Sequence, residues 1–68
     1  MRGFSNTGYA GYFEGRLFTT EFVELQEISD PTAPSSNQAR LFVRDSASKS
    51  QLCVRFASGA VQVIATEP

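Results

Sequence analysis

The acidic side chains are the first residues of this chain that could do chemistry. Seven are spread along it: Glu14, Glu21, Glu24, Glu27, Asp30, Asp45 and Glu67. A glycosidase needs two carboxyl groups about 5–10 Å apart across a cleft, and Glu14 with Glu24, or Glu21 with Glu27, could share one face. A chain of 68 residues leaves little room for such a cleft. We therefore expect solvated or ion-paired surface carboxylates.

The chain has one cysteine, Cys53, and no histidine. The chain therefore lacks the residues for a zinc site of the usual Cys/His type and for catalysis by histidine. One cysteine allows no intrachain disulfide, and the pattern places no Lys or His beside it to activate the thiol. We expect a small buried residue at Cys53, no catalytic or metal site, no cofactor and no enzymatic activity.

Three arginines form a second candidate group, because Arg40, Arg44 and Arg55 fall on the polar side of alternating strands. Arg40 is expected opposite Arg55, and facing like charges are unfavourable unless an acid lies between them. Residues 12–28, or a neighbouring subunit, would supply that acid in bidentate pairs. The sequence thus predicts an ion-paired face, with a binding site for an anion or an acidic glycan as the alternative.

The elements that would position these arginines are three strands in residues 39–66. Apolar and polar residues alternate there, and two short runs of turn formers interrupt them. The pattern predicts an antiparallel meander with Leu41 opposite Val54, then Phe56 opposite Val61 and Val54 opposite Val63. A slip by one residue would expose the apolar side. The predicted core, shared between copies of the chain, is Leu41, Val43, Leu52, Val54, Phe56, Val61 and Val63.

Two segments precede the meander, and we divide the chain into residues 1–28, 29–38 and 39–68. Residues 12–28 are rich in aromatic and β-branched residues, which predicts a long strand; a helix over 20–28 is the alternative. Residues 29–38 contain two prolines and predict a surface linker. Both sides of the long strand carry large apolar groups, so we expect contacts between chains from Phe13, Leu17, Phe18 and Phe22.

Two aromatic residues stand alone near the start of the chain, Phe4 and Tyr9. We interpret them as packing anchors, and a stacking platform for a sugar is the alternative.

Composition limits the classes of partner. The net charge is −1 and the six cations are scattered, which argues against a nucleic-acid surface. No apolar run approaches the roughly 20 residues of a membrane span, and residues 1–8 lack the apolar region of a signal peptide. Chains below about 70–80 residues rarely fold alone without a disulfide, a metal or a partner. We therefore expect a homo-oligomer.

The C-terminal half resembles a module of tailed-phage and prophage structural proteins. Residues 37–45 (NQARLFVRD), 51–56 (QLCVRF) and 59–68 (GAVQVIATEP) are similar to a short C-terminal module of tail-fibre- and tailspike-like chains. Residues 10–16 (AGYFEGR) resemble the strands that precede it. The resemblance implies a virion protein, usually a trimer of intertwined strands, with no catalytic residues. Such fibres are long, so this chain is either a short virion component or the end of a larger one.

We accordingly expect an all-β structural component of a phage virion. A short C-terminal meander and a long N-terminal strand would intertwine in a homo-oligomer, preferably a trimer, acting as a fibre, spike or attachment module with other virion proteins as partners. One alternative is a receptor- or glycan-binding tip that uses Tyr9, Tyr12 and the arginines against a host-surface glycan. Another is a capsid decoration protein.

Overall fold

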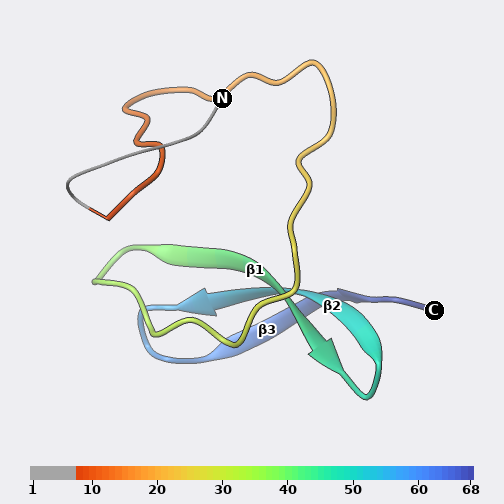
Figure 1. The fold of residues 1–68 in the computed structure, drawn as a ribbon. Coiled ribbons are helices and arrows are strands. Elements are labelled where there is room, and N and C mark those ends of the chain that lie inside the picture. The colour runs from red at the N-terminus through yellow and green to blue at the C-terminus, as the bar shows by residue number, and fades with distance from the viewer. Residues whose placement is uncertain (1–7) are drawn as a thin grey trace.

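A three-stranded antiparallel sheet forms the centre of the protein in the computed structural model, which describes residues 8–68. Its strands are β1 (Ala39–Ser46), β2 (Lys49–Phe56) and β3 (Val61–Thr66), in the spatial order β1-β2-β3 (Figure 1). The predicted meander is confirmed. The described residues contain no helix, so the helical alternative for residues 20–28 is wrong. Among the described residues there is therefore no helix that could cross a membrane.

The first hairpin has the predicted register, with Leu41 opposite Val54 and Arg40 opposite Arg55. Its loop is formed by Ala47 and Ser48, whose φ angles are 52° and 66°. A two-residue loop with positive φ at both positions is a type I′ turn, whose twist matches that of the strands. Asn and Gly are preferred there, so Ala and Ser hold this turn at some cost in strain.

The second hairpin has a different register from the predicted one. Arg55 lies opposite Val61 and Cys53 opposite Val63. The expected pairings of Phe56 with Val61 and of Val54 with Val63 are therefore wrong. Because directly opposite residues share a side of the sheet, Val61 and Val63 lie on the side of the arginines.

The loop of the second hairpin explains this shift. Phe56 donates its N–H to the carbonyl of Ala60 and accepts from the N–H of Gly59, both at 2.9 Å. Gly59 has a φ of 95°, the left-handed conformation that ends a three-residue hairpin loop with a bulge. Phe56 therefore closes the loop against Ala60, and Val61, Gln62 and Val63 move by one position relative to our expectation. A second irregularity, between Leu52 and Cys53, restores the expected register, with Leu52 opposite Ala65.

The sheet has two unlike sides. We call one the open face; it carries Ala39, Leu41, Val43, Leu52, Val54 and Phe56. We call the other the arginine face; it carries Arg40, Phe42, Arg44, Gln51, Cys53, Arg55, Val61 and Val63. Phe42 and Cys53, 3% and 0% exposed, are the buried apolar side chains of the described chain, and they lie opposite each other. In the single chain the core is therefore on the arginine face, not on the side that we predicted.

Residues 29–38 explain why the arginine face, and not the open face, is the buried side of the sheet in the single chain. Pro34 is buried, and residues 30–32 bond to side chains of the arginine face. A type II turn precedes β1: Gln38 donates its N–H to the carbonyl of Ser35 at 3.2 Å, and Asn37 has a φ of 67°. Asn is among the few residues that accept this conformation. The predicted linker thus covers one side of the sheet.

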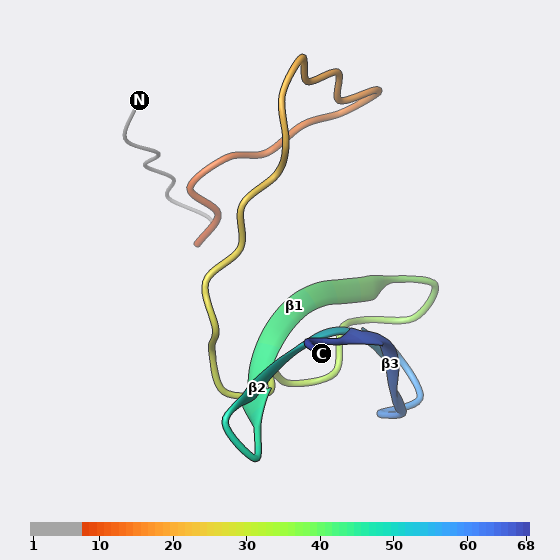
Figure 2. The ribbon, with the colours of Figure 1, turned by 90° about the vertical axis from the view of Figure 1, so that its right-hand side faces the viewer.

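Residues 8–26 contain no strand, so the predicted long strand over residues 12–28 is absent from the single chain. Before Glu27 the chain leaves the sheet in both views (Figures 1 and 2), and it returns beside β1 at Tyr9 and Tyr12, which line a hollow with Arg40. The strand-like pairing found in residues 12–28 is a parallel bridge from Glu27 to Val43. A strand needs partners for its backbone and cover for its apolar side chains, and residues 8–26 have neither in the single chain. Phe4 lies outside the described residues.

Candidate functional site

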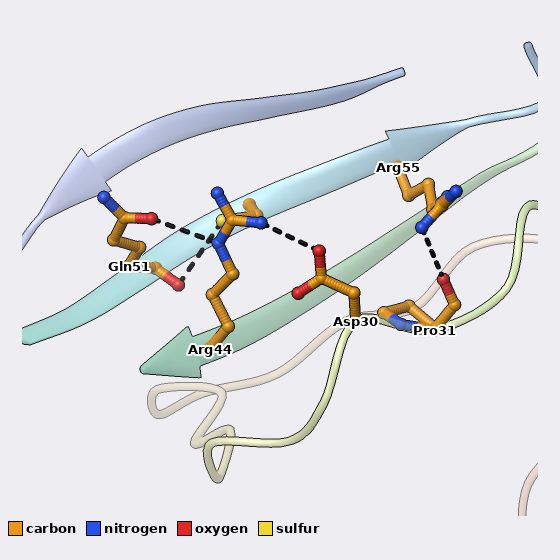
Figure 3. A network of polar contacts seen from close by, with 6 residues as sticks. Asp30, Pro31, Arg44, Gln51 and Arg55 are labelled. Atoms are coloured by element: carbon orange, nitrogen blue, oxygen red, sulfur yellow. Dashed lines mark hydrogen bonds and ion pairs between the residues drawn. The ribbon is translucent and has the colours of Figure 1, made fainter. Parts of the chain in front are cut away.

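The arginine face is a clamp that holds the linker on the sheet. Arg44 forms a salt bridge with Asp30, with 2.8 Å between Nη1 and Oδ2. Its Nε donates to Oε1 of Gln51 at 3.1 Å. Figure 3 shows the guanidinium of Arg44 between these two side chains. The pair is partly exposed, at 28% for Arg44 and 36% for Asp30, so its contribution is moderated by solvent screening.

The other two arginines bond to backbone carbonyls of the same linker. Nη1 of Arg40 donates to the carbonyl and the hydroxyl of Thr32, at 2.8 and 2.9 Å. Nη1 of Arg55 donates to the carbonyl of Pro31 at 3.2 Å (Figure 3). Arg40 and Arg55 face each other across the strands, and each reaches its own acceptor. The carbonyl dipoles, rather than an intervening acid, make this like-charge pair tolerable.

Within the single chain, the acid that pairs with an arginine comes from the linker. Asp30 pairs with Arg44, whereas we expected the acid in residues 12–28; the alternative of a neighbouring subunit stays a prediction. Among the predicted carboxylates, Glu14, Glu21 and Glu24 are exposed on the segment outside the sheet. Glu27 is held at the sheet edge, where it accepts a hydrogen bond from the hydroxyl of Ser50.

A small apolar layer lies beneath the clamp. Cys53 is a free, fully buried thiol, as predicted, and its sulfur lies 3.6 Å from the carbonyl of Gln51. Nε of Arg55 is buried and has no hydrogen-bond partner. The guanidinium groups of the three arginines otherwise bond to the chain's own backbone and side chains.

Two shallow hollows flank the clamp. One, of about 370 Å³, is lined by Glu27, Ile28, Ser29, Asp30, Arg44 and Asp45. In the part of the chain that the structure describes, no three Cys, Asp or Glu residues are grouped to hold a metal ion. The other hollow, of about 390 Å³, is lined by Tyr9, Tyr12, Pro34, Gln38, Ala39 and Arg40. The rings of Tyr9 and Tyr12 meet edge to face, with centroids 5.7 Å apart.

The second hollow brings together residues that the sequence singled out for different reasons. Tyr9 and Tyr12 come from the N-terminal segment and Arg40 from β1. Arg44 and Arg55 are not part of it. Sequence reasoning did not identify Phe42 and Asp30 as the centre and anchor of the arginine face. One signal was available: in the predicted register Phe42 falls opposite Cys53, which places two apolar residues between arginines.

The chain was compared with protein-family models, with curated proteins and with solved structures, and no comparison found a match.

Proposed function

We propose that this chain is a self-assembling structural component of a phage virion, in which several copies, preferably three, cover each other's open faces. The observation that carries the proposal is surface area. The chain exposes 6041 Å², whereas a compact monomer of 7.4 kDa exposes about 4,200 Å². The difference, about 1,800 Å², falls within the roughly 1,000–2,500 Å² that each partner buries in an obligate oligomer.

Large apolar side chains contribute to this surface. On the open face Leu41 is 56% exposed and Phe56 40%. Large side chains of the N-terminal segment are exposed still further: Phe13, Leu17, Phe18 and Phe22, at 63–87%. Clusters of exposed apolar side chains are typical of a protein interface. The resemblance of residues 37–68 to the module of tail fibres and tailspikes supports placing that interface in a virion.

Molar mass in solution tests the assembly. We expect light scattering at micromolar concentration to give a closed oligomer. Val54 lies in the central strand of the open face, and Val54→Asp would bury a carboxylate there at a cost of several kcal/mol. We expect this variant to dissociate. Ser58→Asp, in the exposed second turn, is the control and should leave the oligomer intact.

A wild-type chain that sediments as a monomer and melts cooperatively would disprove the proposal. The virion assignment is tested separately, by labelling purified phage particles with an antibody against this chain. Label at the tail tip or fibre supports an attachment module, and label over the capsid supports the decoration alternative.

The hollow of Tyr9, Tyr12 and Arg40 supports glycan binding as a second candidate function. Aromatic rings offer faces on which a sugar can stack, and Arg40 would bind a carboxylate or hydroxyl of the same sugar. A glycan array with the assembled protein tests this. We expect a saturable signal that is lost in Tyr12→Ala and kept in Tyr12→Phe, which retains the ring. No signal from the wild type would leave the structural role alone.

A further inference from the structure

The outer edge of β1 is a strand position that is only partly filled. β2 pairs with one edge of β1 along its whole length. On the other edge, Ile28 donates its N–H to the carbonyl of Val43 at 2.8 Å, next to the parallel bridge between Glu27 and Val43. Before residue 27 the chain turns away from the sheet (Figures 1 and 2).

The edge remains open beside the first residues of β1. Backbone groups alternate in direction along a strand, so Leu41 and Ala39 point their N–H and C=O groups outward, as Val43 does. Within residues 8–68 no other backbone pairing reaches this edge. A row of unpaired edge groups is a template for a further strand.

The bridge at Glu27 sets the register that such a strand would take. Continuing it towards the N-terminus places Leu25 opposite Leu41 and Val23 opposite Ala39. Gln26 would then donate its N–H to the carbonyl of Leu41.

The direction of the side chains follows from Glu27. Its carboxylate bonds to the hydroxyl of Ser50, which lies on the same side of β2 as Leu52 and Val54. Odd-numbered side chains of the added strand therefore point to the open face. Val23 and Leu25, now 65% and 40% exposed, would extend that face.

We propose that in the assembled protein residues 23–27 pair with β1 as a fourth, parallel strand of the same chain, and that the enlarged open face packs against a second copy. This inference rests on the proposed self-assembly. A second copy fits the face because the three arginines of the sheet all lie on the opposite side, which leaves the β1–β2 part of the open face apolar, with Gln62 of β3 beside Val54. Ordering the strand costs backbone entropy, and only the cover supplied by another copy offsets that cost.

Hydrogen exchange of the assembled native protein tests whether the edge is filled. The amides of Leu41 and Gln26 would donate within the new ladder, whereas that of Leu25 points away from β1. We expect Leu41 and Gln26 to exchange at least about tenfold more slowly than Leu25. Equal, fast exchange of all three in a proven oligomer would overturn the fourth strand and leave the self-assembly standing.

A disulfide tests which chain supplies the strand. With Leu25→Cys and Leu41→Cys in a Cys53→Ala background, opposed residues of adjacent strands lie at a separation that a disulfide can span. We expect oxidation of the oligomer to give cross-linked single chains on a denaturing gel. Covalent dimers would show instead that a neighbour supplies the strand, and an uncross-linked product would show that the register is wrong. Either result overturns the inference.

Substitution of Leu25 by a charged residue tests whether its side chain faces the second copy. We expect Leu25→Asp to dissociate the oligomer, and Gln26→Asp, on the opposite side of the strand, to leave it intact. The sheet should survive in both, because neither side chain belongs to the buried pair of Phe42 and Cys53. Equal behaviour of the two variants would overturn the assignment of this face. A monomeric wild type would instead reject the proposed function itself.

Discussion

The two faces of the sheet differ in how they are completed. The arginine face carries three cations and is covered over β1 and β2 within one chain, because the linker lies across it and each arginine holds part of that linker; Val63 of β3, on the same face, is 43% exposed. The open face is apolar over β1 and β2, with Gln62 of β3 opposite Val54, yet no segment of the described chain covers it as the linker covers Phe42. Leu41 is 56% exposed there, whereas its neighbour Phe42 is 3% exposed on the other side.

The difference shows that polarity alone is a poor guide to burial in so small a sheet. Arginine has a long aliphatic stem that covers apolar surface while its head group bonds elsewhere. Arg40 and Arg44 flank Phe42 at positions two residues away on the same side of β1. The arginines therefore bind the linker that covers Phe42. The open face, which has more apolar residues, binds no such segment and remains available for another chain.

The largest expected effect is a difference in the free energy of unfolding between a substitution on the arginine face and one on the open face. Phe42→Ala removes the main side chain of the single-chain core and should lower the free energy of unfolding by about 3–5 kcal/mol, enough to unfold most of a domain this small. Leu41→Ala is the matched control and should cost about 0.5 kcal/mol or less in a monomer. In the monomeric Val54→Asp background, circular dichroism detects the loss of the sheet in Phe42→Ala, and urea denaturation measures the smaller cost of Leu41→Ala. Equal losses would show that the two faces do not differ as described.

The sequence was sufficient to predict the strands and the first hairpin, because alternation and a two-residue loop leave one register for Leu41 and Val54. It was not sufficient for the second hairpin, where the bulge at Gly59 moves Val61 and Val63 to the other side. Nor could it show which face is buried, because that depends on where Asp30 meets the sheet. The contact of Asp30 with Arg44 joins two distant segments, and local periodicity carries no information about such contacts. The alternation of apolar residues also does not show where a strand contains a bulge.

The N-terminal segment is a different case. Residues 12–28 have the composition of a strand, yet the single chain leaves them unpaired except at Glu27. Propensity becomes structure only when hydrogen-bond partners and cover are present. The candidate site shows the same limit: Tyr9, Tyr12 and Arg40 were named from the sequence, but the hollow that they share is a property of the fold.

An intermediate effect is expected at the first turn, which belongs to neither face. Ala47 and Ser48 both have positive φ, and replacing them by Asn and Gly supplies the preferred type I′ pair. We expect the double variant to raise the free energy of unfolding by about 1 kcal/mol. The association constant of the folded chains should not change, which separates sheet stability from assembly. A lower melting temperature would show that this turn is not strained.

The smallest expected effect concerns the clamp itself. Arg44 and Asp30 are both partly exposed, so a double-mutant cycle with Arg44→Met and Asp30→Asn should give a coupling energy of about 0.2–1 kcal/mol, decreasing in high salt. Arg40→Met should cost a similar amount, but this cost should increase in high salt, because its partner Thr32 is neutral and the substitution also removes the repulsion from Arg55. A coupling of zero at low salt would show that the salt bridge of Arg44 with Asp30 does not hold the linker. The linker would then be held by the hydrogen bonds of Arg40 and Arg55 and by the burial of Pro34.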